Sequence, residues 1–266
     1  MDRADGSADW HDVWFADANT GTAVGSSGVI IHTTNGGASW APRASGLEGV
    51  AFFAADFADV NHGTAVGYTG IIYSTTDGGV TWKPHTGGVT NDLYETSFSD
   101  ANTGTVVGTR GTILRTTDGG ALWTTRPSGT TEHLHSVSFP DANSATIVGD
   151  FGIIMRTIDA GMSWVAQIPP TNADLIAVSF SDANTGTVVG NAGTILRTTD
   201  AGITWTEQIS SSNEFFSGVA FTDSNVGTIV GNSGVILRTN TGGIIVSVKE
   251  ITDAFEYNTD PACCVI

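Results

Sequence analysis

The segment SFSDANTGTVVGTRGTILRTTDGGALW, residues 97–123, decides the fold, because close copies of it recur along most of the chain. Each copy contains an Asp-x-Asn motif, which begins at Asp17, Asp59, Asp100, Asp141, Asp182 and Asp223. The spacing is 42 residues once and 41 residues thereafter. A fixed period of this size is typical of a repeat architecture.

Each copy contains four short strands separated by tight turns. Asp, Asn and Gly favour such turns, because Asp bonds its own backbone and Asn and Gly tolerate positive φ. In the fifth copy the expected strands are residues 176–180, 187–189, 194–198 and 205–209. Four antiparallel strands in a repeat of about 40–45 residues predict an all-β fold, a six-bladed β-propeller of four-stranded antiparallel blades.

The repeat also predicts the domain organisation, with a leader at residues 1–9, a propeller at 10–250 and a tail at 251–266. The expected blades are residues 10–48, 49–91, 92–133, 134–174, 175–214 and 215–250. The first copy starts with its own first strand, and the last copy ends with its own fourth strand, residues 244–248. Unless the tail adds a strand, we therefore expect the ring to close only by packing between the first and sixth blades, as its weakest contact.

Composition and charge exclude several classes of partner. Ten basic residues against 27 acidic ones give a net charge of −17, which opposes binding to nucleic acid and to anionic lipid. No stretch approaches the ~20 apolar residues of a membrane helix, so membrane insertion is not expected. The first ten residues do not resemble a signal peptide, and the protein is therefore expected to be either intracellular or a mature secreted form.

The turn between the third and fourth strands repeats the pattern Ser/Thr-x-Asp-x-Gly-x-Thr/Ser-Trp, and it resembles the Asp-box, or BNR repeat, of sialidases and other propellers. The sixth copy, residues 239–246, has lost both the Asp and the Trp. The longer repeat, over residues 10–246, resembles the photosystem II stability/assembly factor repeat family, and this resemblance implies a propeller. The residues at the Asp and Trp positions are Asn35, Asp77, Asp118, Asp159 and Asp200, and Trp40, Trp82, Trp123, Trp164 and Trp205.

The recurrence of the Asp-box in five of the six copies favours a structural role. We expect its Asp to accept backbone N–H bonds in the turn and its Trp to pack between blades. An arginine precedes the box in four copies, at Arg115, Arg156, Arg197 and Arg238. These arginines would bind carboxylates or sulfates if they formed a ring, but pairing with local acids or carbonyls is the expected arrangement.

Catalytic and metal-binding patterns are incomplete. A sialidase needs an arginine cluster, a Tyr nucleophile with a Glu partner, and an Asp acid/base. Tyr94 and Glu95 are adjacent on a predicted strand, so strict alternation would point them to opposite faces. His133 and His135 form half of a metal site without a third ligand at matching spacing. We therefore expect no catalytic residue, no cofactor and no metal.

The copies differ mainly in the turn between the second and third strands and in the loops between blades. Hairpin geometry places both on one side of the disc, which we call the variable face. Exposed aromatic and charged loop residues on a rigid scaffold are typical of binding sites, although solvent-exposed turns that have merely drifted would look similar. The candidate binding residues on this face are Tyr68, His85, Arg110, His133, Asp150 and Phe151.

These observations predict a non-catalytic binding or scaffold protein that recognises a protein or a glycan and that is extracytoplasmic, secreted or at the cell surface. Residues 247–253 resemble the linker before sorting domains of some secreted bacterial proteins. Cys263 and Cys264 end the chain in a form that matches a prenylation box, and either could instead join two copies in a homo-oligomer. The alternatives are a chaperone like the photosystem assembly factors, a sialidase-like glycoside hydrolase, and a self-assembling surface or filament subunit.

Overall fold

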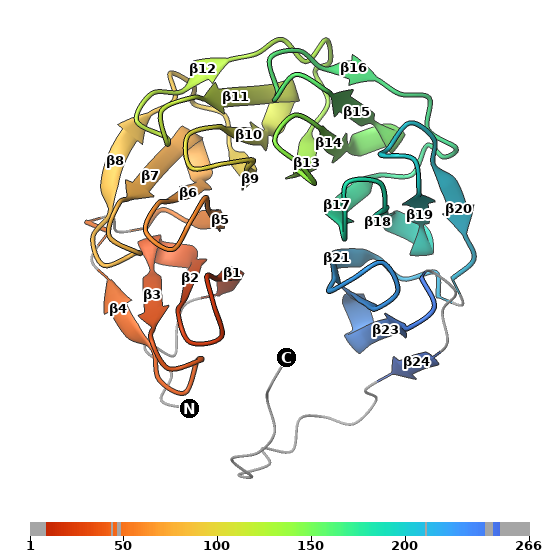
Figure 1. The fold of residues 1–266 in the computed structure, drawn as a ribbon, viewed down its shortest axis with the longest axis horizontal. Helices are drawn as coiled ribbons and strands as arrows, with labels where there is room; N and C mark the ends of the chain where they lie inside the picture. The colour runs from red at the N-terminus through yellow and green to blue at the C-terminus, as the bar shows by residue number, and fades with distance from the viewer. Residues whose placement is uncertain (1–8, 44, 47–48, 211, 243–246, 251–266) are drawn as a thin grey trace.

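The chain folds into the predicted six-bladed β-propeller, with a four-stranded antiparallel sheet in each blade, in a computed structural model (Figure 1). The structure describes residues 9–43, 45–46, 49–210, 212–242 and 247–250. Cys263 and Cys264 therefore lie outside the described residues. In the part of the chain that is described, no helix has the length and apolar character needed to cross a membrane.

Every blade is a sheet in which the strands follow sequence order from the central channel outward (Figure 1). Blade 1 comprises β1 (Trp10–Phe15), β2 (Gly21–Gly25), β3 (Ile30–Thr33) and β4 (Ala41–Arg43); blade 2, β5 (Phe52–Phe57), β6 (Gly63–Gly67), β7 (Ile71–Thr75) and β8 (Lys83–Thr86); blade 3, β9 (Leu93–Phe98), β10 (Gly104–Gly108), β11 (Thr112–Thr116) and β12 (Thr124–Thr125). Blade 4 comprises β13 (Leu134–Ser138), β14 (Ala145–Gly149), β15 (Ile154–Thr157) and β16 (Val165–Ala166); blade 5, β17 (Leu175–Phe180), β18 (Gly186–Gly190), β19 (Ile195–Thr198) and β20 (Thr206–Gln208); blade 6, β21 (Phe216–Phe221), β22 (Gly227–Gly231), β23 (Val235–Thr239) and β24 (Ser247–Glu250).

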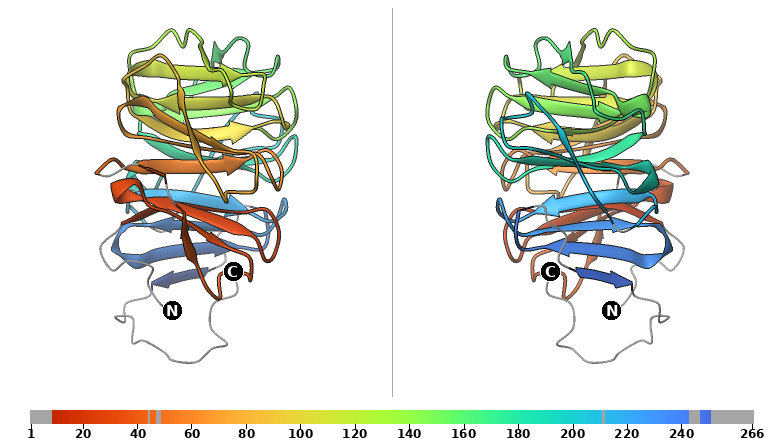
Figure 2. Two further views of the ribbon diagram at one scale, coloured as in Figure 1. Left: turned by 90° about the vertical axis from the view of Figure 1, so that its left-hand side faces the viewer. Right: turned by 90° about the vertical axis from the view of Figure 1, so that its right-hand side faces the viewer.

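The strands run across the thickness of the disc, so the turns lie on its two opposite faces (Figure 2). On one face the Asp-box turn bonds the Asp-x-Asn turn, as the Gly119 amide donates to the Asn102 carbonyl at 2.9 Å. On the variable face, the turn after the second strand is bonded to the loop that precedes the first strand. In blade 3 the Thr109 amide donates to the Asp92 carbonyl at 2.9 Å. The two kinds of turn are therefore separated as the hairpin geometry predicts.

Glycine is required where the second strand reaches the variable face. A Cβ at Gly108 would lie 2.0 Å from the Asp92 carbonyl oxygen, well inside van der Waals contact. The same contact recurs in blade 5, where a Cβ at Gly190 would lie 2.0 Å from the Asp174 carbonyl oxygen. The repeated glycine therefore lets the backbone that enters the innermost strand pass directly over the end of the second strand.

The Asp-box carboxylates lie in the hydrogen-bonded turns expected for them. Asp77 accepts the Thr81 amide at 2.8 Å and the Thr81 hydroxyl at 2.6 Å, and it also accepts the Thr75 hydroxyl at 2.8 Å. Although burial opposes the change, these bonds lower the pKa of Asp77. The Trp82 indole N–H donates to the Gly79 carbonyl at 3.1 Å, and its ring packs edge-on against Phe57.

The hydrophobic core lies between blades. One cluster joins Val66 and Ile72 of blade 2 to Leu93, Val106 and Trp123 of blade 3. All of these side chains are buried, and equivalent clusters join other neighbouring blades. Burial of apolar surface against the next repeat is the main stabilising term of such an array, since no blade can bury its faces alone.

The repeated arginines also cross from one blade to the next. Arg115 Nε donates to the Ala160 carbonyl at 2.6 Å, and Arg156 Nε donates to the Ala201 carbonyl at 2.7 Å. Both acceptors belong to the Asp-box turn of the following blade. Arg197 instead donates to the Ser224 carbonyl at 2.7 Å and lies 5.2 Å from the centre of the Phe221 ring. These three arginines are thus committed to contacts between blades.

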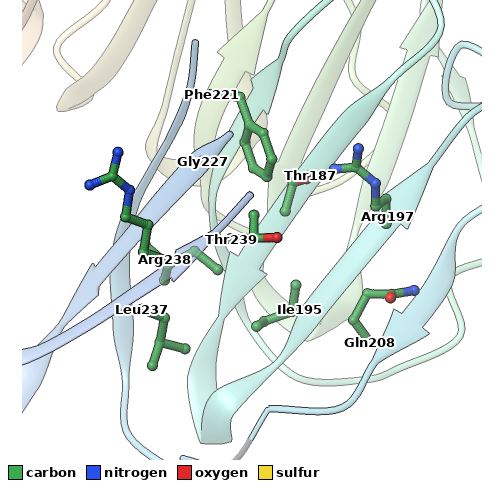
Figure 3. A pocket seen from close by; sticks show the side chains of 10 residues that line it. Thr187, Ile195, Arg197, Gln208, Phe221, Gly227, Leu237, Arg238 and Thr239 are labelled. Carbon is green, nitrogen blue, oxygen red and sulfur yellow. Dashed lines mark hydrogen bonds between the residues drawn. The ribbon is translucent and has the colours of Figure 1, made fainter. Parts of the chain in front are cut away.

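A small pocket lies between blades 5 and 6, lined on one side by Thr187 and Arg197 and on the other by Phe221 and Leu237 (Figure 3). In blade 5 the Trp205 ring packs edge-on against Phe180, the residue equivalent to Phe221. The sixth Asp-box has no tryptophan in its sequence. The pocket therefore lies where the repeat would otherwise place an indole ring.

The expected closure between the first and sixth blades is not found among the described residues. Figure 1 shows these blades on either side of an opening, which we call the open side of the ring. Trp10, Val13 and Phe15 of β1 are exposed there, and so is Val230 of β22. Among the described residues, the first and last copies each keep their own four strands, so no strand is exchanged across the seam.

Candidate functional site

The innermost strand of every blade carries a β-bulge just after it begins. In blade 3, Leu93 pairs with Gly108 and Glu95 pairs with Val107, so Tyr94 is the extra residue. The same shift occurs in the other five blades. A bulge redirects a side chain and is common beside functional sites. This bulge position is occupied, in chain order, by His11, Phe53, Tyr94, His135, Ile176 and Ser217.

Four consecutive blades place an aromatic ring at the bulge position, and we call His11, Phe53, Tyr94 and His135 the aromatic arc. The ring centres are 5.5 Å apart for His11 and Phe53, 5.8 Å for Phe53 and Tyr94, and 5.5 Å for Tyr94 and His135. The last pair is stacked, with 17° between the planes. The arc is therefore a continuous aromatic surface on the inner strands of blades 1–4.

Residues of the variable face extend the arc outward. The Tyr68 ring lies 6.2 Å from Phe53, and the His133 ring lies 6.3 Å from Tyr94. Asp150 Oδ1 is 2.6 Å from His135 Nε2, and this pair holds the imidazole against Tyr94. The structure thus brings three of the sequence-predicted binding residues, Tyr68, His133 and Asp150, to one aromatic site.

The turns beside the arc hold a non-glycine residue in the left-handed region. The φ angles are 54° at Thr69, 55° at Arg110 and 55° at Phe151, an uncommon conformation for β-branched and bulky residues. The following blade bonds each of these amides, through Asp92 at 2.8 Å, His133 at 3.2 Å and Asp174 at 2.9 Å respectively. These bonds fix the turns that carry the exposed side chains of Arg110 and Phe151.

Three carboxyl groups lie on the inner strands of blades 1–3. Asp12 accepts the Ala55 amide at 2.9 Å, and Asp56 accepts the Phe98 amide at 2.8 Å, so each bonds the inner strand of the next blade. Burial, opposed by these bonds and assisted by Asp12, raises the pKa of Asp56 to about 7. Burial and the charges of Asp12 and Asp56 raise the pKa of Glu95 well above its ordinary value. The pKa of Asp12 is also raised, chiefly by burial.

The remaining candidates lie elsewhere. His85 is on the outermost strand β8, where Nε2 is 2.6 Å from the Ser74 hydroxyl and Nδ1 is 3.2 Å from the Ala121 carbonyl oxygen. Phe151 and Arg110 are on the variable face, but no ring contact links them to the arc among the described residues. Sequence reasoning did not select His11, Phe53 or Tyr94 as candidate binding residues. The signal for them was the run of aromatic side chains at a single repeat position.

The bulge also changes the expectation for Tyr94 and Glu95. Strict alternation would send these neighbours to opposite faces, but the extra residue interrupts the alternation at this point. His133 and His135 do lie near each other, with ring centres 6.4 Å apart. Within the described residues, however, no group of three or more His, Cys, Asp or Glu side chains is arranged to hold a metal ion.

Comparisons with known proteins agree with the repeat pattern. The family model described as "Photosynthesis system II assembly factor YCF48" matches residues 86–171 and 164–247. The chain is similar to a solved structure of YCF48 bound to D1 peptide, with a TM-score of 0.73 and 21% identity, over 90% of this chain and 80% of that chain. YCF48 from Cyanidioschyzon merolae has a TM-score of 0.72 and 19% identity, over 91% and 84%. No curated protein matches the sequence significantly.

The fold is also shared with proteins of other function. A virginiamycin B lyase from Staphylococcus aureus has a TM-score of 0.79 at 14% identity, over 92% of this chain and 85% of that chain. At such identities structural likeness shows the fold alone, whereas the family match also rests on sequence. That match corrects the expected location: an extracellular or cell-surface protein was wrong, because photosystem II is assembled in photosynthetic membranes rather than at the cell surface.

Proposed function

Because this chain belongs to the photosynthesis system II assembly factor YCF48 family, we propose that it is a non-catalytic assembly factor whose propeller binds a segment of a partner protein. The segment lies across the aromatic arc at the variable face. The proposal replaces glycan recognition, our main expectation from the sequence, with the assembly-factor alternative. The bound D1 peptide in a YCF48 structure supports a polypeptide as the ligand of the related fold.

The continuous aromatic arc is the observation that carries this proposal. Its rings come from four different blades, so no single blade needs them for its own packing, and each stands at a bulge that redirects it. Rigid aromatic side chains supply large contact area at low entropic cost, and they are enriched among the residues that dominate binding energy. Tyr94 lies at the centre of the arc and contacts Phe53, His133 and His135.

Charge indicates what kind of segment fits. Asp92 and Asp150 both lie close enough to raise the pKa of Tyr94, after the larger effect of burial. The chain as a whole carries a net charge of −17. Aromatic faces beside carboxylates attract Lys and Arg side chains through cation–π and ion-pair contacts. A segment with a basic residue at the arc is therefore favoured over an acidic one.

Two carboxylates of the inner strands, Asp12 and Asp56, support a role without catalysis. A glycoside hydrolase needs one carboxyl group to protonate the leaving group and another to act as base or nucleophile. Asp12 and Asp56 instead accept amide hydrogens from the next blade's inner strand. These hydrogen bonds link the inner strands of neighbouring blades, which is a structural role.

Isothermal titration with a synthetic D1 peptide, of the kind bound in the YCF48 structure, tests the proposal. We expect binding in the micromolar range and a loss of roughly tenfold or more in Tyr94→Ala, which removes a central aromatic contact. Ile176→Ala, at the same repeat position of blade 5, is the matched control and should bind like the parent. Equal affinity of the two variants would contradict the site.

Two modified peptides test the charge preference separately. Replacing a neutral residue of the peptide with Lys should tighten binding, and replacing it with Glu should weaken it. The opposite order would refute a cation-selective arc while leaving peptide binding intact. Binding to a glycan array with no binding to any peptide would overturn the proposed function.

A further inference from the structure

The pocket between blades 5 and 6 has the walls that enclose a tryptophan ring elsewhere in the repeat (Figure 3). In blade 5 the Trp205 ring is buried against Phe180, with ring centres 6.0 Å apart, in the cluster that joins blades 4 and 5. Four members of that cluster lie one repeat before residues that line the pocket: Ile154, Phe180, Val188 and Leu196 correspond to Ile195, Phe221, Ile229 and Leu237. Trp205 corresponds to Val246, so blade 6 supplies no indole ring to a space shaped by the same repeat positions.

The pocket is cationic as well as apolar. Of the residues that line it, Arg197 and Arg238 are charged and none is acidic. Figure 3 shows the Arg238 guanidinium pointing away from Arg197, so Arg197 supplies the charge of the pocket. Arg197 is 9% exposed, and its Cζ lies 5.2 Å from the centre of the Phe221 ring. A guanidinium group therefore lies against the ring that a tryptophan of blade 6 would contact.

The Arg197 guanidinium has neutral hydrogen-bond partners. Its Nη1 donates to the Thr187 hydroxyl at 3.0 Å, and its Nη2 donates to the Ser224 carbonyl at 2.7 Å. Burial lowers the pKa of Arg197, and Asp182, whose charge opposes this effect, forms no ion pair with it within the described residues. In the same part of the chain, its Nε does not form the bond to the following Asp-box turn that the arginines of blades 3 and 4 form. A buried cation with remaining N–H donors favours a carboxylate, which accepts two of them at once.

We infer that the pocket between blades 5 and 6 binds a small planar aromatic carboxylate, of the size of an indole acid. Its ring packs on Phe221, Ile229 and Leu237, in the place that tryptophan occupies in the preceding blade. Its carboxylate accepts hydrogen bonds from Arg197, whose unbranched side chain can change rotamer to admit the ring and then stack on it. A neutral aromatic compound would leave this cation unpaired, and an aliphatic acid would leave the apolar walls uncovered. The site lies on blades that the aromatic arc does not use, so peptide binding at the arc is not required for it.

Saturation-transfer NMR with the full chain tests this site, in about 0.15 M salt so that the net charge of −17 is largely screened. The probes are indole-3-acetate and indole-3-acetamide, which share the ring and differ in charge. Indole-3-acetate should bind saturably with a Kd of about 1 mM, the affinity expected for a ligand of its size. The amide should bind roughly tenfold more weakly, because it leaves the guanidinium without a carboxylate. Equal binding of the two probes, or saturable binding of neither, would overturn the proposal.

A third probe identifies the source of the aromatic acid. N-acetyltryptophan carries the same ring and a free carboxylate, as a tryptophan at the carboxyl end of a polypeptide does. Displacement of indole-3-acetate by this compound would show that the site accepts the end of a polypeptide. Binding of indole-3-acetate without such displacement would show that it accepts a free small acid, and either result supports the proposed ligand class.

Variants of the chain test the position of the site. Val246→Trp supplies the missing ring from within the protein, so it should abolish indole-3-acetate binding while keeping the parent's circular dichroism. Arg197→Gln should bring the affinities for the acid and the amide within about twofold of each other. Arg156→Gln is the matched control, because it removes the same kind of contact between blades where Trp205 already fills the space, and it should bind indole-3-acetate like the parent. Undiminished binding of indole-3-acetate to Val246→Trp would refute the site, even if Arg197→Gln did not fold.

Discussion

Blades 1–4 and blades 5–6 have the same backbone at the channel and different chemistry on it. The bulge after the first residue of the inner strand is present in both groups of blades. In blades 1–4 the bulge residue is His11, Phe53, Tyr94 or His135, and in blades 5–6 it is Ile176 or Ser217. The features that both groups share hold the scaffold together, and the positions that differ are where binding chemistry can be placed.

The largest expected effects are at two glycines that lie beside the bulge, one in blade 3 and one in blade 5. A Cβ at Gly108, beside Tyr94, or at Gly190, beside Ile176, would lie 2.0 Å from a backbone carbonyl oxygen. Gly108→Ala and Gly190→Ala should therefore each destabilise the fold by about 3 kcal/mol or more, because the backbone must move. Urea denaturation followed by circular dichroism measures both.

Peptide binding should separate these two variants although their stabilities match. At a temperature where both remain folded, Gly108→Ala should lose affinity for the D1 peptide, because the displaced strand carries Tyr94. Gly190→Ala should retain it. Equal losses of affinity would mean that the arc is not the binding surface. Unequal losses of stability would mean that the glycine has different roles in blade 3 and blade 5.

Sequence reasoning reached the scaffold because the scaffold is periodic. The Asp-x-Asn motif, the glycines and the Asp-box recur at one spacing, and each acts through short-range turn geometry that residue type determines. The expected strand of residues 194–198 differs from β19 (Ile195–Thr198) by a single residue. Tyr68, His133 and Asp150 could also be chosen from the sequence as candidates, since exposed loop residues that vary between copies are typical of binding sites.

The centre of the candidate site, at the bulge position, could not be predicted from the sequence in this way. Tyr94 and Glu95 were assigned to opposite faces by strict alternation, and a bulge depends on how the strand pairs with its neighbour rather than on either residue. His85 was assigned to the variable face because it was counted in the loop between blades, yet it lies on the outer strand β8, beside Ser74 of β7 and the Ala121 carbonyl of the next Asp-box turn. The open side depends on the curvature of the whole ring, which no single repeat specifies.

The buried acidic residues on the inner strands of blades 1–3 make the stability of the fold depend on pH. Burial raises the pKa of Asp56 from 3.8 to about 7, so the folded protein holds this proton more tightly than the unfolded chain. Below about pH 4 the Asp56 carboxyl is protonated in both states and does not affect stability. Between about pH 4 and 7 it increasingly destabilises the folded state, and above pH 7 this destabilisation is constant. Asp56→Asn should therefore leave the free energy of unfolding unchanged near pH 4 and raise it by about 2 kcal/mol at pH 8.

Asp159→Asn is the matched control of opposite sign. Although burial opposes it, hydrogen bonds from Ser163 and Thr157 lower the pKa of Asp159 to about 2. The stability from that group is present above pH 4 and is lost as pH falls toward 2, so the variant should be weaker than the parent at pH 7 and similar at pH 2. Denaturant titrations across pH 2–8 measure both variants. The prediction fails if the free energies of unfolding of Asp56→Asn and Asp159→Asn, each relative to the parent, change with pH in the same direction.

A smaller effect concerns the pocket between blades 5 and 6. The sequence has Val246 at the repeat position of Trp205, and the pocket beside Phe221 lies where that indole would pack (Figure 3). Val246→Trp should raise the free energy of unfolding by about 1 kcal/mol, since an aromatic pair is added and apolar surface is buried. Differential scanning calorimetry measures the gain. Val246→Thr, which fills no more space than valine, should show none, and a loss of stability in the tryptophan variant would mean that the pocket is closed to an indole.

The smallest expected effect comes from extending the aromatic arc into blade 5, which has no aromatic ring at its bulge position. Ile176 stands at the bulge position next to His135 in the ring, so Ile176→Tyr would place a fifth aromatic ring in series with the existing four. Affinity for the D1 peptide should rise by roughly three- to fivefold, the gain typical of one added aromatic contact of about 1 kcal/mol. Val165→Tyr, at an exposed position of the outer strand β16, adds the same side chain away from the channel and should leave affinity unchanged. Equal gains in both variants would show that the peptide responds to surface tyrosine in general, whereas a gain at Ile176 alone would show that the bulge position makes any blade able to contribute to the site.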